Sequence, residues 1–160
     1  MAGVAAGLVA SFAMDVFQKA WTALAADKET NKNDKPKPAT LKAADKVSQA
    51  VAGKVVPDQA QTAASAGVHY VTGAALGAVY GVAAEFAPAT TFGFGGLYGS
   101  ATWLVLDEGL SPALGLAPRP GDVAAADHAY ALVSHLVFGA ALEFTRGAAS
   151  RLLSWEPIAG

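Results

Sequence analysis

Two long uncharged stretches constrain the fold of this chain more than any other feature. Between Asp58 and Glu85, and again between Glu85 and Asp107, the sequence contains no Asp, Glu, Lys or Arg. Each stretch exceeds the roughly 20 residues that a helix needs to cross about 30 Å of hydrocarbon. Pro88 lies in the short "EFAPAT" segment between them, where a proline favours a helix boundary. The two stretches therefore predict two membrane spans joined by a tight turn.

Two further apolar segments, at 4–26 and 124–146, have the same character. Hydrophobic residues make up 53% of the 160-residue chain, which is high for a soluble domain. We therefore predict an all-α integral membrane bundle of four transmembrane helices, a single domain over 1–160 with spans at about 4–26, 62–85, 89–107 and 124–146. Two alternatives remain: a signal peptide for the first segment, where "ALA" at 23–25 mimics a cleavage site, and a soluble Ala-rich bundle for the whole chain.

The polar loop at 27–58 differs from the rest of the chain. It holds 12 of the 24 charged residues, including seven lysines. Its second part, "TLKAADKVSQAVAGKVV", has apolar residues at helical spacing, which predicts a short amphipathic helix on the membrane surface or an ordinary connector helix. By the positive-inside rule the lysines place this loop in the cytoplasm, and they would also suit anionic lipid.

Composition excludes several classes of function. The chain has no cysteine, which removes disulfides, thiolate metal sites and thiol nucleophiles. A formal charge of -2, without basic residues interleaved among aromatics, predicts no nucleic-acid binding. The sequence has no nucleophile elbow, phosphate loop or HExxH motif, and no predicted strand precedes "FGFGGLYG". We therefore predict that the chain is not an enzyme.

The chain resembles itself in its two halves. "HYVTGAAL" at 69–76 matches "HLVFGAAL" at 135–142 in six of eight positions, and "GLVAS" at 7–11 resembles "GLYGS" at 96–100. The order is the same in both halves, which predicts two pseudo-repeated helical hairpins related by an axis along the membrane normal; chance similarity among Gly and Ala is the alternative. Glycines at four-residue spacing predict close helix packing, in particular Gly73, Gly77, Gly81 and Gly139.

The repeat brings ionisable side chains into register. It makes His69 and His135 equivalent positions facing a common interior, and it aligns Gln18 and Lys19 with Asp107 and Glu108, whose opposite charges would pair across the axis. On the predicted topology one half of the membrane holds a polar site, and the other half has little beyond two interfacial glutamates. The candidate site residues are His69, His135, His128, Asp107, Asp15 and Lys19.

Three interpretations of this cluster remain open. It predicts a site for a proton, a cation or a small solute in a channel or transporter, or else hydrogen bonds that hold together a non-transporting structural or accessory membrane protein. His128 and His135 lie about 10 Å apart along one helix, so they cannot bind the same metal ion. A minor third interpretation is haem between His69 and His135, with Gly73 and Gly139 leaving room for the porphyrin.

Three strings resemble the YagU-like family of uncharacterised inner-membrane proteins: "VHYVTGAALGAVYGVAAEFAP", "WLVLDEGLSPALGLAP" and "HAYALVSHLVFGAALEFTR". The resemblance implies a small multi-pass protein of the inner (plasma) membrane, and acid tolerance is associated with that family. It supplies no substrate, cofactor or catalytic residue. We expect the lipid bilayer to surround the chain, and a second copy or another membrane protein to be its partner.

Overall fold

The structure is a computed structural model that describes residues 2–24 and 37–153. The described residues form helices and no strands, so the all-α prediction is confirmed. No helix within them combines the length and the apolarity that crossing a bilayer requires. In chain order the elements are α1 (Ala2–Leu24), α2 (Ala39–Ala52), η2 (Asp58–Ala60), α3 (Gln61–Phe86), η3 (Pro88–Thr91), α4 (Gly96–Trp103), η4 (Leu104–Leu110), α5 (Ser111–Ala113), η5 (Pro120–Asp122) and α6 (Ala125–Leu153).

Helices α1 and α3 occupy nearly the ranges expected for the first two segments, whereas the third segment differs. Its helix begins at Gly96 rather than at residue 89. The reason is the turn before it, where Gly93, Phe94 and Gly95 have φ values of 63°, 57° and 80°. Left-handed residues cannot continue a right-handed helix. The helix then passes without a break from α4 into η4, a seven-residue π-helix.

Glycines set the contacts between the main helices. In the first helix pair, Gly3 and Gly7 of α1 lie against Gly77 and Gly73 of α3. In the second helix pair, Gly95, which directly precedes α4, and Gly99 of α4 lie against Gly139 and His135 of α6. Both pairs are antiparallel, because the residue numbers rise along one helix as they fall along the other. All four glycines predicted to pack lie at these contacts: Gly73, Gly77, Gly81 and Gly139.

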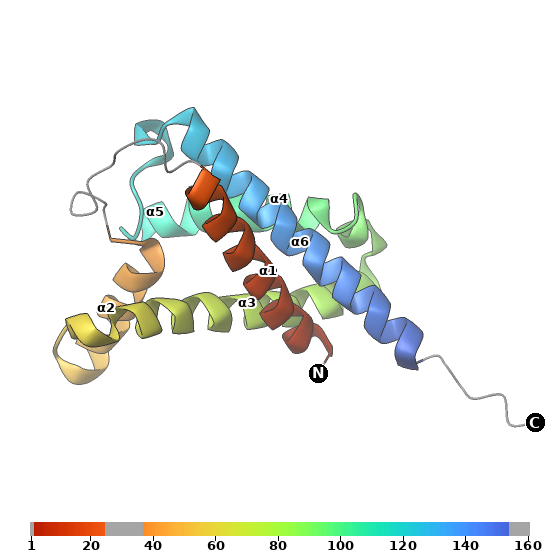
Figure 1. The fold of residues 1–160 in the computed structure, drawn as a ribbon, viewed down its shortest axis with the longest axis horizontal. Coiled ribbons are helices and arrows are strands. Elements are labelled where there is room, and N and C mark those ends of the chain that lie inside the picture. The colour runs from red at the N-terminus through yellow and green to blue at the C-terminus, as the bar shows by residue number, and fades with distance from the viewer. Residues whose placement is uncertain (1, 25–36, 154–160) are drawn as a thin grey trace, which may run out of the picture.

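Helix α1 joins the two helix pairs, since it also packs along α6. Figure 1 shows α1 beside α6, with α1 crossing in front of α3. The buried hydrophobic residues of these helices form a small core. It contains Ala6, Ala10 and Met14 from α1, Tyr80 from α3, and Phe138 and Leu142 from α6.

Large apolar side chains lie mainly on the outside of this bundle. Phe12 is 62% exposed, Val71 71% and Phe86 85%. By contrast, Ser11 and Ser134 lie at the centre with no exposed surface. The bundle thus buries two serines beside its small core and leaves many bulky hydrophobic residues on its surface.

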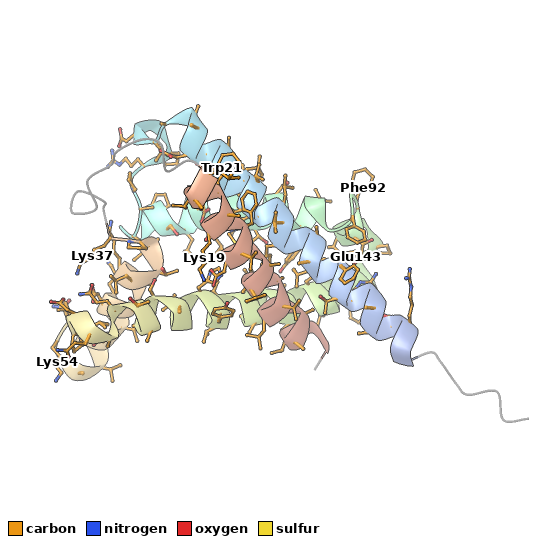
Figure 2. The ribbon with its side chains drawn as sticks, viewed as in Figure 1. Lys19, Trp21, Lys37, Lys54, Phe92 and Glu143 are labelled. Carbon is orange, nitrogen blue, oxygen red and sulfur yellow. The ribbon has the colours of Figure 1, made fainter. Side chains whose placement is uncertain are left out.

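Helix α2 packs on the N-terminal part of α3 (Figure 1). It buries Leu41 and Ala44, and a 2.6 Å hydrogen bond joins the hydroxyls of Thr40 and Ser65. This helix covers the segment expected to be amphipathic, whereas most of the preceding polar stretch lies outside the described residues. Figure 2 shows Lys37 and Lys54 beside α2, while Phe92 and Glu143 lie toward the opposite end of the molecule.

Candidate functional site

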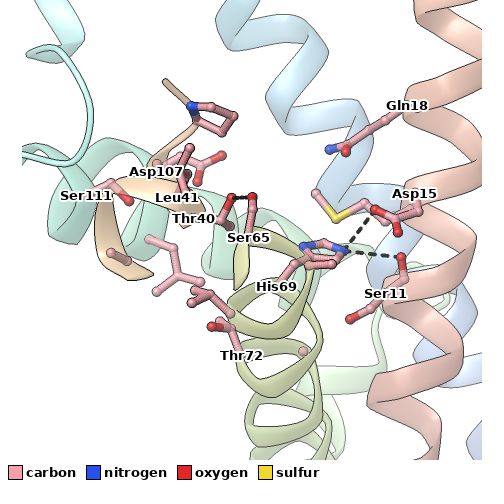
Figure 3. Close-up of a pocket in the computed structure, with 18 of the residues that line it drawn as sticks. Ser11, Asp15, Gln18, Thr40, Leu41, Ser65, His69, Thr72, Asp107 and Ser111 are labelled. Atoms are coloured by element: carbon pink, nitrogen blue, oxygen red, sulfur yellow. Dashed lines mark hydrogen bonds and ion pairs between the residues drawn. The ribbon is translucent and has the colours of Figure 1, made fainter. Parts of the chain in front are cut away.

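A cavity of about 850 Å³ lies between α1, α2, α3, the segment from η4 to α5, and α6 (Figure 3). Its walls mix apolar side chains with a few ionisable ones. Five of the six candidate site residues line it: Asp15, Lys19, His69, Asp107 and His135. The structure therefore brings to one cavity residues that are up to 120 positions apart in the sequence.

The first helix pair contributes Asp15 and His69 to the cavity. The Nε2 atom of His69 lies 3.4 Å from Oδ1 of Asp15 and 3.3 Å from the backbone oxygen of Ser11 (Figure 3). The hydroxyl of Tyr70 donates a 2.9 Å hydrogen bond to Oδ2 of Asp15. Each oxygen of the Asp15 carboxylate on α1 thus has a partner, and both partners, His69 and Tyr70, come from α3.

The second helix pair contributes Asp107 and His135. His135 is 8% exposed, and its Nδ1 lies 3.0 Å from the backbone oxygen of Ala131 and 3.6 Å from Oδ2 of Asp107. A carbonyl oxygen can only accept, so this contact places the proton on Nδ1. At 3.6 Å the carboxylate is too distant for a hydrogen bond. Asp107 therefore has an electrostatic partner and, within the described part of the chain, no hydrogen-bond donor.

The two Asp–His pairs arise from a common spacing in the two helix pairs. Asp15 follows Gly7 by eight residues, and Asp107 follows Gly99 by eight. Each glycine lies at a helix contact, so each carboxylate lies about two turns beyond its contact. This spacing corrects the alignment of Gln18 and Lys19 with Asp107 and Glu108. In the described ranges those residues form no ion pair across the axis, and the aspartates contact histidines instead.

His128 is the candidate residue that lies outside the cavity. Its Nδ1 is 2.6 Å from Oε1 of Glu108, and its Nε2 is 3.0 Å from the backbone oxygen of Pro120. The ring also meets the edge of Trp103 at a centroid distance of 6.5 Å. His128 thus connects the beginning of α6 to η4 and η5. Lys19 lies at the rim of the cavity, where its side chain is exposed and also borders a shallower pocket next to Tyr130.

A polar network closes the bundle beyond the floor of the cavity. Along α3 the cavity ends at Leu76, and Tyr80 lies one turn further. Tyr80 is 1% exposed and donates a 2.5 Å hydrogen bond to Oε2 of Glu143, while Arg146 donates to both carboxylate oxygens at 2.8 and 2.6 Å. The hydroxyl of Tyr98 donates a 2.7 Å bond to the backbone oxygen of Leu76. This network links the two helix pairs at the end away from the cavity.

Sequence reasoning missed the tyrosines whose hydroxyls donate to the carboxylates of Asp15 and Glu143 and to the backbone oxygen of Leu76. Tyr70 and Tyr80 lie within the second predicted span, and Tyr98 lies within the third. A signal for them exists, because a phenol hydroxyl placed in an apolar helix needs a hydrogen-bond partner. The partners Asp15 and Glu143 are too far away in the sequence for spacing alone to identify them.

Two features of the described residues concern a metal ion or haem. Within the described ranges, no group of three or more His, Asp or Glu side chains is placed to hold a metal ion. The room expected beside Gly73 and Gly139 is filled, because a Cβ on Gly73 would overlap Ser11 and one on Gly139 would lie 3.0 Å from the carbonyl carbon of Gly95. Both glycines therefore serve close helix contact.

Comparison with known proteins gives one match. The model of a family described as "Protein of unknown function (DUF1440)" matches residues 21–144, which is more than half of the chain and includes most of the cavity residues. No curated protein and no solved structure matches the chain.

Proposed function

The chain belongs to the DUF1440 family of proteins of unknown function, and we propose that it is a small integral membrane protein that transports a small solute or a proton through its His/Asp site. One observation carries this proposal: a single cavity collects an Asp–His pair from each of the two helix pairs. Ionisable residues in a membrane bundle face its interior and mark pathways for ions or substrates.

The distribution of side chains supports a lipid environment. In a bilayer, helices associate through close backbone contact at small residues, because apolar burial between helices gains little. The glycine contacts of both helix pairs have this character. The exposed Phe12, Val71 and Phe86 would face lipid, while Ser11 and Ser134 lie inside. As part of the proposal, the α2 side with its lysines faces the cytoplasm, in line with the likeness to YagU-like inner-membrane proteins.

The dimensions and lining of the cavity support solute binding. Small-molecule sites have volumes of about 300–1,000 Å³ and consist of apolar walls with a few convergent polar groups. The cavity has this volume and this lining. The Tyr80–Glu143–Arg146 network closes the bundle on the other side. A site that is accessible from one side at a time is what alternating access requires.

A specific observation favours the alternative of a non-transporting structural or accessory protein. His69 contacts both Asp15 and the Ser11 carbonyl, so it ties α3 to α1. If His69 served only to hold α1 and α3 together, the Asp–His pairs would affect assembly and not transport.

Flux through proteoliposomes separates these two possibilities. The full chain is reconstituted, vesicles are washed in alkaline carbonate to retain only embedded protein, and an enclosed pH-sensitive dye reports proton entry. Uptake of radiolabelled methylammonium is followed in parallel. We expect at least one of the two fluxes to exceed that of empty vesicles and to fall to background in His69→Ala and His135→Ala. The matched control is Asp122→Asn, an exposed carboxylate away from the cavity.

The transport proposal is wrong if wild type and both histidine variants match empty vesicles for proton and methylammonium. The structural alternative then predicts that the same two variants lower the thermal unfolding temperature or change the oligomeric state, while Asp122→Asn leaves both unchanged.

A further inference from the structure

Of the two carboxylates that line the cavity, Asp107 has fewer partners. Asp15 accepts a hydrogen bond from Tyr70 and contacts His69. Among residues 2–24 and 37–153, Asp107 has only the 3.6 Å contact with Nδ1 of His135, and that nitrogen already donates to Ala131. Its side chain is 39% exposed at the cavity wall. A carboxylate has about four acceptor positions, so Asp107 is free to accept several hydrogen bonds from a ligand.

A second polar group without a partner lies at the floor of the same cavity. Ser11 is fully buried and lines the cavity, and no hydrogen bond to its Oγ is present in the described residues. Buried hydroxyls are nearly always hydrogen-bonded. The Oγ of Ser11 lies against Gly73 with almost no exposed surface, so within the described ranges Asp107 is the group without a hydrogen-bond partner that a ligand in the cavity can reach.

The fixed charges and the walls define the chemistry of that ligand. With both histidines neutral, Asp15, Asp107 and Lys19 sum to one negative charge, which a monovalent cation balances. Much of the remaining wall is apolar, and it includes Met14, Leu76, Leu106, Leu110 and Phe138. A bare metal ion gains nothing from such walls and needs several oxygen or nitrogen ligands. An organic ammonium ion uses both features, because its N–H groups donate to Asp107 while its hydrocarbon part removes the walls from water.

We propose that the cavity binds a small organic ammonium ion, with its nitrogen at the Asp107 carboxylate and its hydrocarbon part against Leu110 and Phe138. This inference rests on the proposed function, because it names the class of solute that the cavity takes. His135 lies 3.6 Å from this carboxylate, and the exposed Lys19 at the rim repels ligands with a second positive charge.

Equilibrium dialysis of the purified full chain in lipid nanodiscs tests the assignment, with radiolabelled butylammonium as the probe. Butyrate, sodium ion and 4-aminobutyrate serve as competitors. We expect butylammonium to bind, and we expect butyrate and sodium not to displace it. A hydrogen bond to a charged group has a net value that corresponds to roughly a tenfold to hundredfold change in affinity. Asp107→Asn should therefore weaken binding by about that factor, whereas Asp107→Glu and the control Asp122→Asn should retain it.

Several results would overturn the assignment. One is butylammonium binding that is absent in the wild type or equal in Asp107→Asn. Another is equal displacement by butyrate or sodium. A third is tighter binding of 4-aminobutyrate that is lost in Lys19→Gln, since this would identify a zwitterion rather than a monocation. If Asp107→Asn fails to fold by circular dichroism, the selectivity of the wild type among the four probes decides. Butylammonium binding without flux in proteoliposomes would refute transport and keep the ammonium site. Flux without butylammonium binding would refute the ammonium site and keep transport.

Discussion

Two glycines of α3 allow a direct test of how the first helix pair is held together. Gly77 lies at the contact with α1, and a Cβ placed on it would come within 2.5 Å of Gly7 Cα and 2.6 Å of Gly7 N. Gly67 lies on the same helix, and a Cβ placed there would meet nothing within 4 Å. Alanine at both positions gains the same helix propensity, about 0.5–1 kcal/mol. The two substitutions therefore differ only in the contact with α1.

The size of the difference follows from the geometry. Ordinary Cβ contacts begin at 3.4 Å, so Gly77→Ala requires α1 and α3 to separate by about 0.9 Å at this point. Both sides of the contact are backbone, which cannot rotate away. Overpacking of this kind costs about 1–3 kcal/mol. At about 2 kcal/mol, with a shift of about 2–4 °C per kcal/mol for a chain of this size, Gly77→Ala should unfold about 4–8 °C below Gly67→Ala.

Thermal unfolding in detergent micelles, followed by far-ultraviolet circular dichroism, measures this difference. We expect Gly67→Ala to equal or slightly exceed the wild type, and Gly77→Ala to fall below both. Equal unfolding temperatures for the two variants would refute the argument, because they would mean that backbone contact at Gly77 does not hold the helices together. The same comparison is available on α6, where Gly139 lies at the contact with α4 and an added Cβ on Gly147 meets nothing within 4 Å.

Two further predictions concern the ends of the bundle and its cofactors. Tyr80→Phe removes the donor to Glu143, and it should lower the free energy of unfolding by about 1.5–3 kcal/mol in chemical denaturation. Tyr70 is more exposed, so Tyr70→Phe should lower this free energy by less. An equal or greater loss in Tyr70→Phe would contradict the role given to the Tyr80 network. The visible absorption spectrum and metal content of the purified full chain should reveal neither haem nor a stoichiometric metal ion. The reasons are that the described residues contain no group of three or more His, Asp or Glu side chains placed for a metal ion, and that Gly73 is in backbone contact with α1. A Soret band that is lost in His69→Ala or His135→Ala would show this reasoning to be wrong.

Hydropathy predicts the long helices well because they depend on local composition. The uncharged run after Asp58 becomes α3 almost residue for residue, and the glycine spacing predicts which face of α3 meets α1. Hydropathy fails at 89–95, where an apolar stretch contains a turn. The left-handed residues from Gly93 to Gly95 carry no charge and leave the hydropathy unchanged. Only the density of glycine in "FGFGG" signals the break.

Five of the six candidate residues line one cavity, but the sequence does not predict which of them contact each other. The repeat aligns His69 with His135, and the count of ionisable residues along each segment places most of the set on one side. The carboxylate that each histidine contacts depends on how far each helix pair is shifted along its own axis. That shift is set by backbone contacts at Gly7 and Gly99, which side-chain patterns describe only indirectly. The alignment of Lys19 with Glu108 was therefore misleading.

The number of residues in the π-helix η4 determines which side chains form the cavity wall. Its turns are wider than those of an α-helix, and within it the adjacent Asp107 and Glu108 serve different partners, His135 and His128. Removing one residue between Leu104 and Asp107 would shift Asp107 and Glu108 by one position relative to the residues before them. Asp107 could then no longer face the cavity while Glu108 holds His128. A change of length by a single residue in this segment should thus be more damaging than replacement of any one of its apolar side chains.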